Sequence, residues 1–147
     1  MFLADQASKY YVVHVLQLKE GQPIDVFSPY LVFTMAWNRG VNFGLGAGFD
    51  VKWILIAVAV AISAAVLIWL WRHPAKRMTY VAGGLLIGGA LGNVVDRLLY
   101  GAVADFLNMS CCGFRNPFAF NIADVAIFVC AIGIAFSDSG APKKKRA

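Results

Sequence analysis

Charged side chains are scarce in this sequence. Asp, Glu, Lys and Arg together make up 14% of the 147 residues, whereas apolar residues make up 60%. A soluble domain typically has about 25% charged residues. The composition therefore argues against a soluble enzyme and predicts a polytopic membrane protein, with residues 1–147 forming one compact domain.

Patterns for metal binding are also lacking. The chain has two His and three Cys, with no Cys-x-x-Cys or His-rich spacing of the kind found in zinc sites. Cys111 and Cys112 are adjacent, and Cys130 stands alone in an apolar run. We therefore predict no metal site, and the cysteine pattern indicates no particular disulfide.

Basic residues outnumber acidic ones by 13 to 8, but their distribution argues against a nucleic-acid partner. Three of them fall within residues 72–77 and four within 143–146, and both clusters flank apolar segments. Clustered Lys and Arg beside membrane segments mark the cytoplasmic side. No aromatic residues are interleaved with these clusters, as nucleic-acid binding would favour.

Long apolar runs predict four membrane helices with both chain ends inside. Val51–Leu70 is the clearest run, because interfacial tryptophans bracket it and a basic loop follows it. Met78–Val95 contains no charge and must return to the outer side. Residues 1–18 are too polar to span alone, so we expect the outer part of a first helix whose beginning is missing. The predicted order is a first membrane helix at about 1–18, an outer sheet at 19–50, a second helix at 51–71, an inner loop at 72–77, a third helix at 78–100, an outer segment at 101–120, a fourth helix at 121–137 and an inner basic tail at 138–147.

Residues 19–50 have the composition of a small sheet. Tyr30–Trp37 is aromatic, β-branched or otherwise apolar, which is typical of short strands. Asn38-Arg39-Gly40 indicates a hairpin turn, in which Gly40 is available for a positive φ. We expect this sheet to lie at the outer membrane surface.

The third predicted helix has a stripe of glycines that leads to an acid. Gly84, Gly88 and Gly92 recur every four residues, and such a stripe lets helices pack closely in lipid. Asp96 is the next residue on the stripe, so its carboxylate should face protein. Two interpretations of Asp96 stay open: a functional acid, or a structural one that pairs with Arg97 or another neighbour.

Two further acids, Asp105 and Asp124, come from different segments but from the same outer depth. Gly101 weakens the helix after residue 100, so Asp105 should lie on a bent segment that points back at the bundle. Two adjacent aspartates cannot both ionise easily and can share a proton across a water molecule. This is the chemistry of aspartic proteases, which requires no metal or cofactor.

An asparagine precedes two of the acids by three residues. Asn93 with Asp96, and Asn121 with Asp124, place amide donors about one helical turn from each acid. Acids within membranes also serve proton relays and ion paths, and spacing does not separate these roles. Two alternatives to a peptidase therefore remain: an ion or proton translocator that uses Asp96 and Asp124, and a scaffold whose polar groups only pack helices.

Five segments of the chain belong together as motifs. They are Asp5-Gln6-Ala7-Ser8-Lys9, Asn38-Arg39-Gly40-Val41-Asn42-Phe43-Gly44, Gly88-Gly89-Ala90-Leu91-Gly92-Asn93-Val94-Val95-Asp96-Arg97, Gly101-Ala102-Val103-Ala104-Asp105-Phe106 and Phe120-Asn121-Ile122-Ala123-Asp124. At these residues the chain resembles the lipoprotein signal peptidases, also called signal peptidase II. Each motif is weak alone, but five in this order are highly specific.

The resemblance implies a mainly α, polytopic endopeptidase of the bacterial inner membrane. It implies a bundle of four transmembrane helices, with the sheet as a substrate cradle and the active site near the periplasmic face. The substrates would be prolipoproteins that carry diacylglycerol on the lipobox cysteine. Cleavage would fall just before that cysteine and release the signal peptide. Membrane lipid is the other partner we expect, and we expect a monomer.

The resemblance also assigns roles by position. Asp105 and Asp124 would be the catalytic dyad. The residues that would support the site and position the substrate are Asn93, Asp96, Arg97 and Asn121. Asn38 and Gly40 would belong to the outer sheet, and Asp5 and Lys9 would help to hold the site or the lipid headgroup region.

Overall fold

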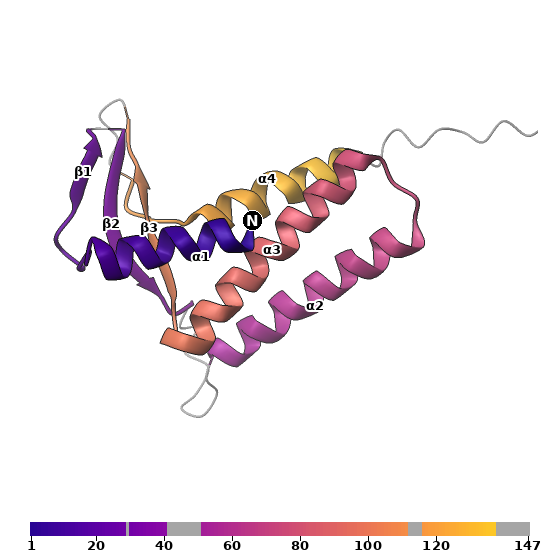
Figure 1. The fold of residues 1–147 in the computed structure, drawn as a ribbon, viewed down its shortest axis with the longest axis horizontal. Helices are drawn as coiled ribbons and strands as arrows, with labels where there is room; N and C mark the ends of the chain where they lie inside the picture. The colour runs from indigo at the N-terminus through magenta and orange to yellow at the C-terminus, as the bar shows by residue number, and fades with distance from the viewer. Residues whose placement is uncertain (29, 41–50, 112–115, 138–147) are drawn as a thin grey trace, which may run out of the picture.

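Helices make up most of the chain, and a small sheet lies at one end of them (Figure 1). The structure, a computed structural model, describes residues 1–28, 30–40, 51–111 and 116–137. The elements in chain order are α1 (Phe2–Tyr10), the π-helix η1 (Tyr11–Val15), β1 (Ile24–Phe27), β2 (Leu31–Asn38), α2 (Val51–Arg72), α3 (Arg77–Tyr100), β3 (Val103–Met109) and α4 (Ile122–Ser137). The expected fold class, mainly α with a small sheet, is confirmed.

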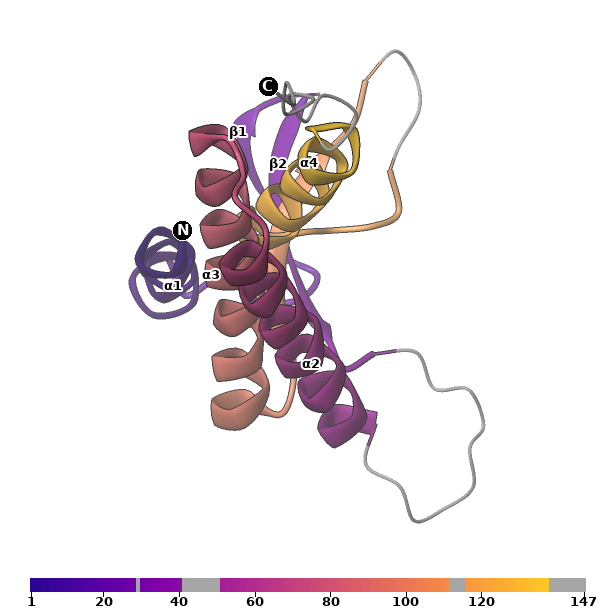
Figure 2. The ribbon, with the colours of Figure 1, turned by 90° about the vertical axis from the view of Figure 1, so that its right-hand side faces the viewer.

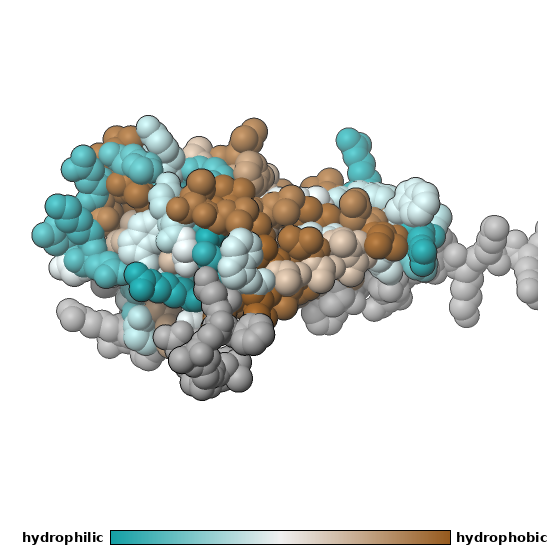
Figure 3. All heavy atoms as spheres, turned by 90° about the horizontal axis from the view of Figure 1, so that it is seen from below, coloured by the Kyte–Doolittle hydropathy of each residue, from teal (hydrophilic) through white to brown (hydrophobic). Residues whose placement is uncertain are grey.

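Helices α2 and α3 are long and apolar enough to cross a membrane, and α4 contains a shorter apolar stretch, Ile122–Ile134. The 22 residues of α2 reach about 33 Å at 1.5 Å per residue, close to the thickness of a bilayer's hydrocarbon core. Apolar side chains cover the outside of the helices, and hydrophilic residues gather at both ends of this belt (Figure 3). Such a surface suits contact with lipid tails.

Helix α3 is the centre of the fold, since α1, α2 and α4 all pack against it. Figure 2 shows α1 on one side of α3, with α2 and α4 on the other. Helix α1 begins beside the middle of α3 and runs toward the sheet (Figure 1). The half of α3 that carries Asp96 is therefore enclosed by α1 and α4.

The glycine stripe of α3 serves helix packing at two of its three positions. A Cβ at Gly88 would come within 3.1 Å of the backbone of α1, and a Cβ at Gly92 within 2.5 Å of the Asp5 carboxylate. Both glycines therefore let α1 lie against α3. A Cβ at Gly84 would meet no neighbouring element within 4 Å.

The sheet is antiparallel and has the strand order β1-β2-β3. Strand β3 comes from the segment after Gly101, for which the sequence suggested only a bent or unwound chain. Gly101 ends α3 with a φ of 73°, so the chain reverses and β3 returns along β2. In the register of this pair, Ala36 lies opposite Asp105. The pairing thus places Asp105 beside the last residues of β2.

Strand β1 ends at Phe27 and β2 begins at Leu31. Asn38, for which we expected a hairpin turn, is instead the last residue of β2 and pairs with Val103. Gly40 does adopt a positive φ, 87°. The remainder of this motif, residues 41–44, lies outside the described part of the chain.

An apolar core joins the N-terminal segment to the sheet. Val12 of η1 is buried together with Leu18, Met35, Ala104 and Phe106. Met35 and Phe106 come from β2 and β3, so the core holds both strands against η1. This packing fixes the sheet relative to α1 and, through α1, to α3.

The contact between Gly92 and Asp5 yields a stability prediction. In Gly92→Ala the added methyl group would overlap a carboxylate that is held in place, so we expect a loss of about 1–3 kcal/mol of unfolding free energy. The measurement is thermal unfolding of the purified protein in detergent micelles. Gly84→Ala is the matched control, because its methyl group enters open space, and it should be neutral or slightly stabilising. Equal effects of the two substitutions would contradict the packing described here.

Candidate active site

Asp105 lies on β3 and is almost completely buried, with 3% of its surface exposed. Both carboxylate oxygens accept hydrogen bonds from asparagine side chains. Asn38 Nδ2 donates to Oδ2 at 3.0 Å, and Asn121 Nδ2 donates to Oδ1 at 2.6 Å. Asn38 lies on β2 and Asn121 immediately before α4, so three segments meet at this carboxyl group.

Asp124 lies in the first turn of α4 and is half-buried. Its Oδ1 accepts a hydrogen bond from Asn93 Nδ2 at 3.0 Å, and its Oδ2 accepts one from the backbone nitrogen of Asn121 at 3.1 Å. The backbone nitrogen of Asp124 in turn donates to Asn121 Oδ1 at 3.0 Å. This reciprocal pair is the arrangement of a capping box, which explains why the asparagine stands three residues before the acid.

Asn121 brings the two carboxyl groups together. Its side chain donates to Asp105 while its backbone donates to Asp124, so both acids contact one buried residue. The two carboxyl groups are near enough for the charge of Asp124 to act on Asp105. The structure therefore confirms that these two acids, borne by separate segments, converge on one place.

Burial, with the nearby charge of Asp124 as the second cause, raises the pKa of Asp105 to about 6. The hydrogen bonds from Asn38 and Asn121 and the charge of Lys9 lower the pKa and so oppose this rise. A carboxyl group with this pKa gains or loses a proton close to neutral pH. The pair can therefore hold one proton between its two acids.

A second cluster, centred on Lys9, lies beside the acid pair. The Lys9 ammonium is 2.8 Å from Asp5 Oδ2 and 2.7 Å from Asp96 Oδ2, and it donates to Asn93 Oδ1 at 2.8 Å. Asp5, Lys9 and Asp96 are all buried, with exposures of 0%, 4% and 1%. Asp96 thus pairs with Lys9 rather than with Arg97, the partner that the sequence suggested first.

The Lys9 cluster also holds the backbone of neighbouring elements. Asp5 Oδ1 accepts a hydrogen bond from the backbone nitrogen of Ala123 at 3.2 Å, and Asp96 Oδ2 accepts one from that of Ala104 at 3.4 Å. Ala104 and Ala123 each immediately precede one acid of the pair. The cluster therefore fixes the backbone of β3 and α4 next to each acid of the pair.

Three asparagines share one arrangement around the acid pair. Each presents its NH₂ group to a carboxylate because its oxygen is occupied by a donor. The donor is the backbone nitrogen of Gly40 for Asn38, the backbone nitrogen of Asp124 for Asn121, and Lys9 for Asn93. An ammonium group can only donate, so Lys9 forces the oxygen of Asn93 toward itself and the NH₂ group toward Asp124.

Arg97 lies at the edge of the site and is half-buried. Its Nη1 donates to the carbonyl of Asn93 at 3.2 Å. The guanidinium is near enough to interact with the charges of Asp105, Asp124 and Asp96. It is therefore placed to offset the negative charge of the acid pair.

All ten candidate site residues thus belong to two joined clusters. Sequence reasoning missed the role of Gln6, whose Nε2 donates to Asp96 Oδ1 at 2.9 Å and to the carbonyl of Gly92 at 3.2 Å. Its place in the first motif was the signal that could have found it. Within the described residues, no three His, Cys, Asp or Glu side chains are grouped to hold a metal ion.

Comparisons with known proteins agree on one family. The family model described as Signal peptidase (SPase) II matches residues 1–138. A lipoprotein signal peptidase of Methylorubrum extorquens (strain PA1) is 39% identical over 135 residues, which are 88% of this chain and 75% of that protein. A lipoprotein signal peptidase of Alteromonas mediterranea is 43% identical over 131 residues, 87% of this chain and 70% of that protein.

Solved structures of bacterial membrane enzymes also match the chain. A bacterial membrane enzyme determined by the in meso method at 2.3 Å resolution matches with a TM-score of 0.76 and 29% identity, over 99% of this chain and 88% of that one. A second such structure, at 1.9 Å resolution, matches with a TM-score of 0.77 and the same identity, over 92% of this chain and 84% of that one. The likeness covers both the helices and the sheet.

The buried Lys9 cluster yields one prediction. Lys9→Met would leave two buried carboxylates without their cation, so we expect a loss of about 3–5 kcal/mol of unfolding free energy. Lys9→Met combined with Asp96→Asn should recover part of that loss. Thermal unfolding in micelles measures both. Lys19→Met removes an equal charge from an exposed position and should change little. A Lys9→Met protein as stable as the wild type would show that the cluster is not a stabilising ion pair.

The raised pKa of Asp105 yields a second prediction, on the pH dependence of stability. An unperturbed carboxyl titrates near 3.8, whereas Asp105 titrates near 6 in the folded protein. Between these values the folded state binds more protons than the unfolded state, so this residue makes the unfolding free energy fall as pH rises. The melting temperature of Asp105→Asn, relative to wild type, should therefore rise from about pH 4 to pH 6 and then level off.

The measurement is a series of thermal unfolding scans in detergent between pH 4 and 8. Asp25→Asn, which removes an exposed carboxylate of β1, controls for the loss of one negative charge. A difference between Asp105→Asn and wild type that grows toward acid pH would show that the sign of the shift is wrong.

Proposed function

The chain belongs to the signal peptidase II family, and we propose that Asp105 and Asp124 are the catalytic pair with which it hydrolyses its substrate. The family consists of aspartic proteases, and this chain removes signal peptides from prolipoproteins. The observation that carries the proposed dyad is the hydrogen bonding of both carboxylates to Asn121. The raised pKa of Asp105 supports it, because one acid must hold a proton while the other is ionised.

In the proposed mechanism Asp124 is the base and Asp105 the acid. Asp124 takes a proton from a water molecule while the water oxygen attacks the scissile carbonyl carbon. Asp105 gives its proton to the carbonyl oxygen. The resulting gem-diol then collapses. Asp124 passes its proton to the leaving nitrogen, the C–N bond breaks, and Asp105 regains a proton from a diol hydroxyl. Each acid exchanges one proton in the addition step and one in the collapse step, so the pair returns to its starting state and the reaction balances without a metal or cofactor.

The supporting residues have roles that follow from their contacts. Asn38, Asn93 and Asn121 hold the two carboxyl groups by donated hydrogen bonds, which leaves other lone pairs for the water molecule. Arg97 offsets the negative charge of the pair. Asp5, Lys9 and Asp96 act through Asn93 and the backbone, so they are positioning residues rather than catalytic ones.

We place the enzyme in the bacterial inner membrane with both chain ends in the cytoplasm. Basic residues cluster in the loop between α2 and α3, which marks the cytoplasmic side. The sheet lies at the other end of the helices (Figure 1), and Asp105 belongs to its strand β3, so we assign this end to the periplasmic side. In this arrangement the first helical segment, α2, α3 and α4 are the four membrane helices, and the chain functions as a monomer.

The proposed depth of the site suits a lipid-anchored substrate. A precursor with diacylglycerol on its lipobox cysteine holds the preceding peptide bond at the membrane interface. Asp105 and Asp124 lie where the helices meet the sheet, which is the level of that interface in the proposed topology. In this proposal the scissile bond of the substrate and the acid pair lie at the same depth in the membrane.

Ion or proton translocation through Asp96 and Asp124 has less support. Asp96 is 1% exposed and paired at 2.7 Å with Lys9, which holds its carboxylate in place. A relay or ion site must be accessible to the ion that it transfers, and the burial of Asp96 opposes this. Among the described residues, Asp96 and Asp124 are not hydrogen-bonded to each other, and Lys9 and Asn93 lie between them.

Substitution of either acid tests the proposal directly. Asp105→Asn and Asp124→Asn should each lower the cleavage rate by about 10²–10⁴-fold or more, since each removes an acid–base group while keeping its shape. The assay follows release of the signal peptide from a diacylglyceryl-modified precursor by the purified protein. Asp25→Asn, with an equal charge change on the exposed strand β1, should cleave at the wild-type rate. Near-normal cleavage by either active-site variant, at normal membrane levels, would remove that residue from the dyad.

A further inference from the structure

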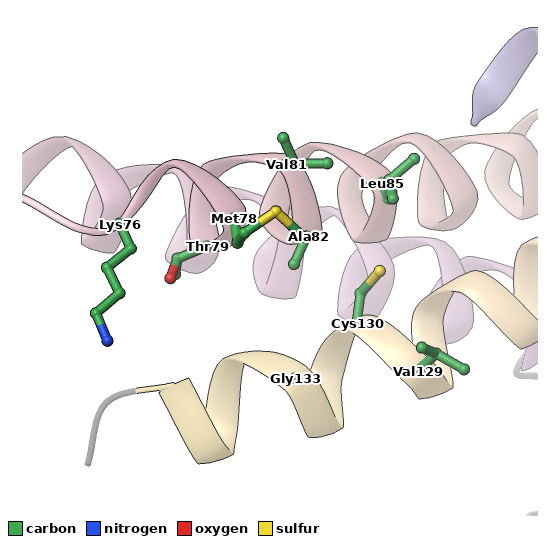
Figure 4. Close-up of a pocket in the computed structure, with 9 residues that line it drawn as sticks. All are labelled: Lys76, Met78, Thr79, Val81, Ala82, Leu85, Val129, Cys130 and Gly133. Carbon is green, nitrogen blue, oxygen red and sulfur yellow. The ribbon is translucent and has the colours of Figure 1, made fainter. Parts of the chain in front are cut away.

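A groove lies between α3 and α4 at the end of the helices that is remote from the acid pair (Figure 4). It has a volume of about 320 Å³ and an almost wholly apolar lining. Met78, Val81 and Leu85 of α3 form one wall, and Val129 of α4 contributes to the other. All four of these apolar side chains are exposed. The groove is at the small end of the range of ligand pockets, which suits one hydrocarbon chain rather than a bulky ligand.

Lys76 stands at the open end of this groove. Figure 4 shows its side chain extending from the start of α3 across the gap toward the end of α4. The side chain is exposed, and no carboxylate of the described residues forms a salt bridge with it. The positively charged Lys76 side chain therefore lies at the open end of the apolar groove.

Among the residues that the structure describes, the charged side chains around this end are all basic. Arg72 and Arg77 flank the same loop as Lys76. The acids that the structure describes lie elsewhere, in α1, the sheet region, the far half of α3 and the start of α4; they are Asp5, Glu20, Asp25, Asp96, Asp105 and Asp124. A ligand with a negative head and an apolar tail would match both the loop and the groove.

We propose that this groove binds one acyl chain of an anionic phospholipid of the inner leaflet, with the lipid phosphate against Lys76. The proposal rests on the topology given under the proposed function, which places the loop between α2 and α3 at the cytoplasmic surface. A phospholipid of that leaflet has its phosphate at this level and its chains directed toward the bilayer centre. The groove runs from Lys76 toward Leu85 in the same sense.

Charge argues against the signal peptide as the occupant. Signal peptides begin with a basic region, which would meet Lys76, Arg72 and Arg77 at the same membrane face and be repelled. A second apolar hollow, between α2 and α3 and lined in part by Trp71 and Gly84, offers a comparison. It includes no charged side chain among its lining residues, so it gives no reason to select an anionic lipid.

Native mass spectrometry of the full-length protein, titrated in detergent with phosphatidylglycerol or phosphatidylethanolamine, tests the proposal. We expect tighter binding of phosphatidylglycerol and a loss of roughly fivefold in its affinity in Lys76→Gln, since one interfacial cation contributes about 1 kcal/mol. Gly133→Leu should weaken binding by roughly tenfold or more, because its side chain fills the groove. The site of Gly133 is open, so this variant should fold.

Two matched variants separate the groove from the rest of the surface. Arg72→Gln removes an equal charge from the same loop, and Gly84→Leu adds the same side chain at the open position in the other hollow. Both should bind phosphatidylglycerol as the wild type does. Equal affinity for the two lipids, or equal effects of Lys76→Gln and Arg72→Gln, would overturn the proposal, as would a dimer in place of the lipid adduct.

Cleavage assays on the same preparations keep the two proposals apart. Lys76→Gln and Gly133→Leu lie outside the acid pair and should cleave a precursor in micelles at the wild-type rate. Lipid binding without cleavage would count against the proposed dyad alone. Cleavage without selective lipid binding would count against the groove alone.

Discussion

The structure depends on one buried ammonium group. Lys9 contacts Asp5, Asp96 and Asn93, and the two acids in turn hold the backbone of α4 and β3. Charges away from water are stable only when they are paired, and the requirement is strictest inside a membrane. Because a misplaced partner would leave a carboxylate unpaired, this cluster ties α1, α3, α4 and β3 into one geometry. The position of the acid pair is a consequence of that geometry.

Asparagine side chains connect this cluster and the neighbouring backbone to the acid pair, and their orientation decides which groups face the two carboxylates. An asparagine side chain can be turned by 180° with little change in shape, and only its hydrogen-bond partners decide which end is the donor. Lys9 settles this for Asn93, and backbone nitrogens settle it for Asn38 and Asn121. All three therefore present donors to the acid pair. The proposed chemistry needs such fixed donors, because a carboxylate that could rotate freely would hold its water molecule in no single place.

The sequence predicted the parts of the fold that depend on local composition. The long helices α2 and α3 follow from apolar runs, and the end of α3 follows from Gly101. Strand β3 was not evident, because its pairing with β2 joins residues about 70 positions apart and its own sequence includes Asp105 and Asn108. The partner of Asp96 was missed for a similar reason.

Arg97 adjoins Asp96 in sequence, but neighbours on a helix point in different directions, whereas Lys9 comes from another helix.

The two joined clusters contain four carboxyl groups, Asp5, Asp96, Asp105 and Asp124, and two cations, Lys9 and Arg97. If every group were ionised, the acids would exceed the cations by two in a place where water is largely excluded. Lys9 is already paired with two acids, Asp5 and Asp96. The excess negative charge therefore falls on Asp105 and Asp124, which Arg97 faces from one side. Retention of a proton by Asp105 relieves it, which is the direction of its raised pKa. The need to limit buried charge and the need for one protonated catalytic acid thus have the same solution.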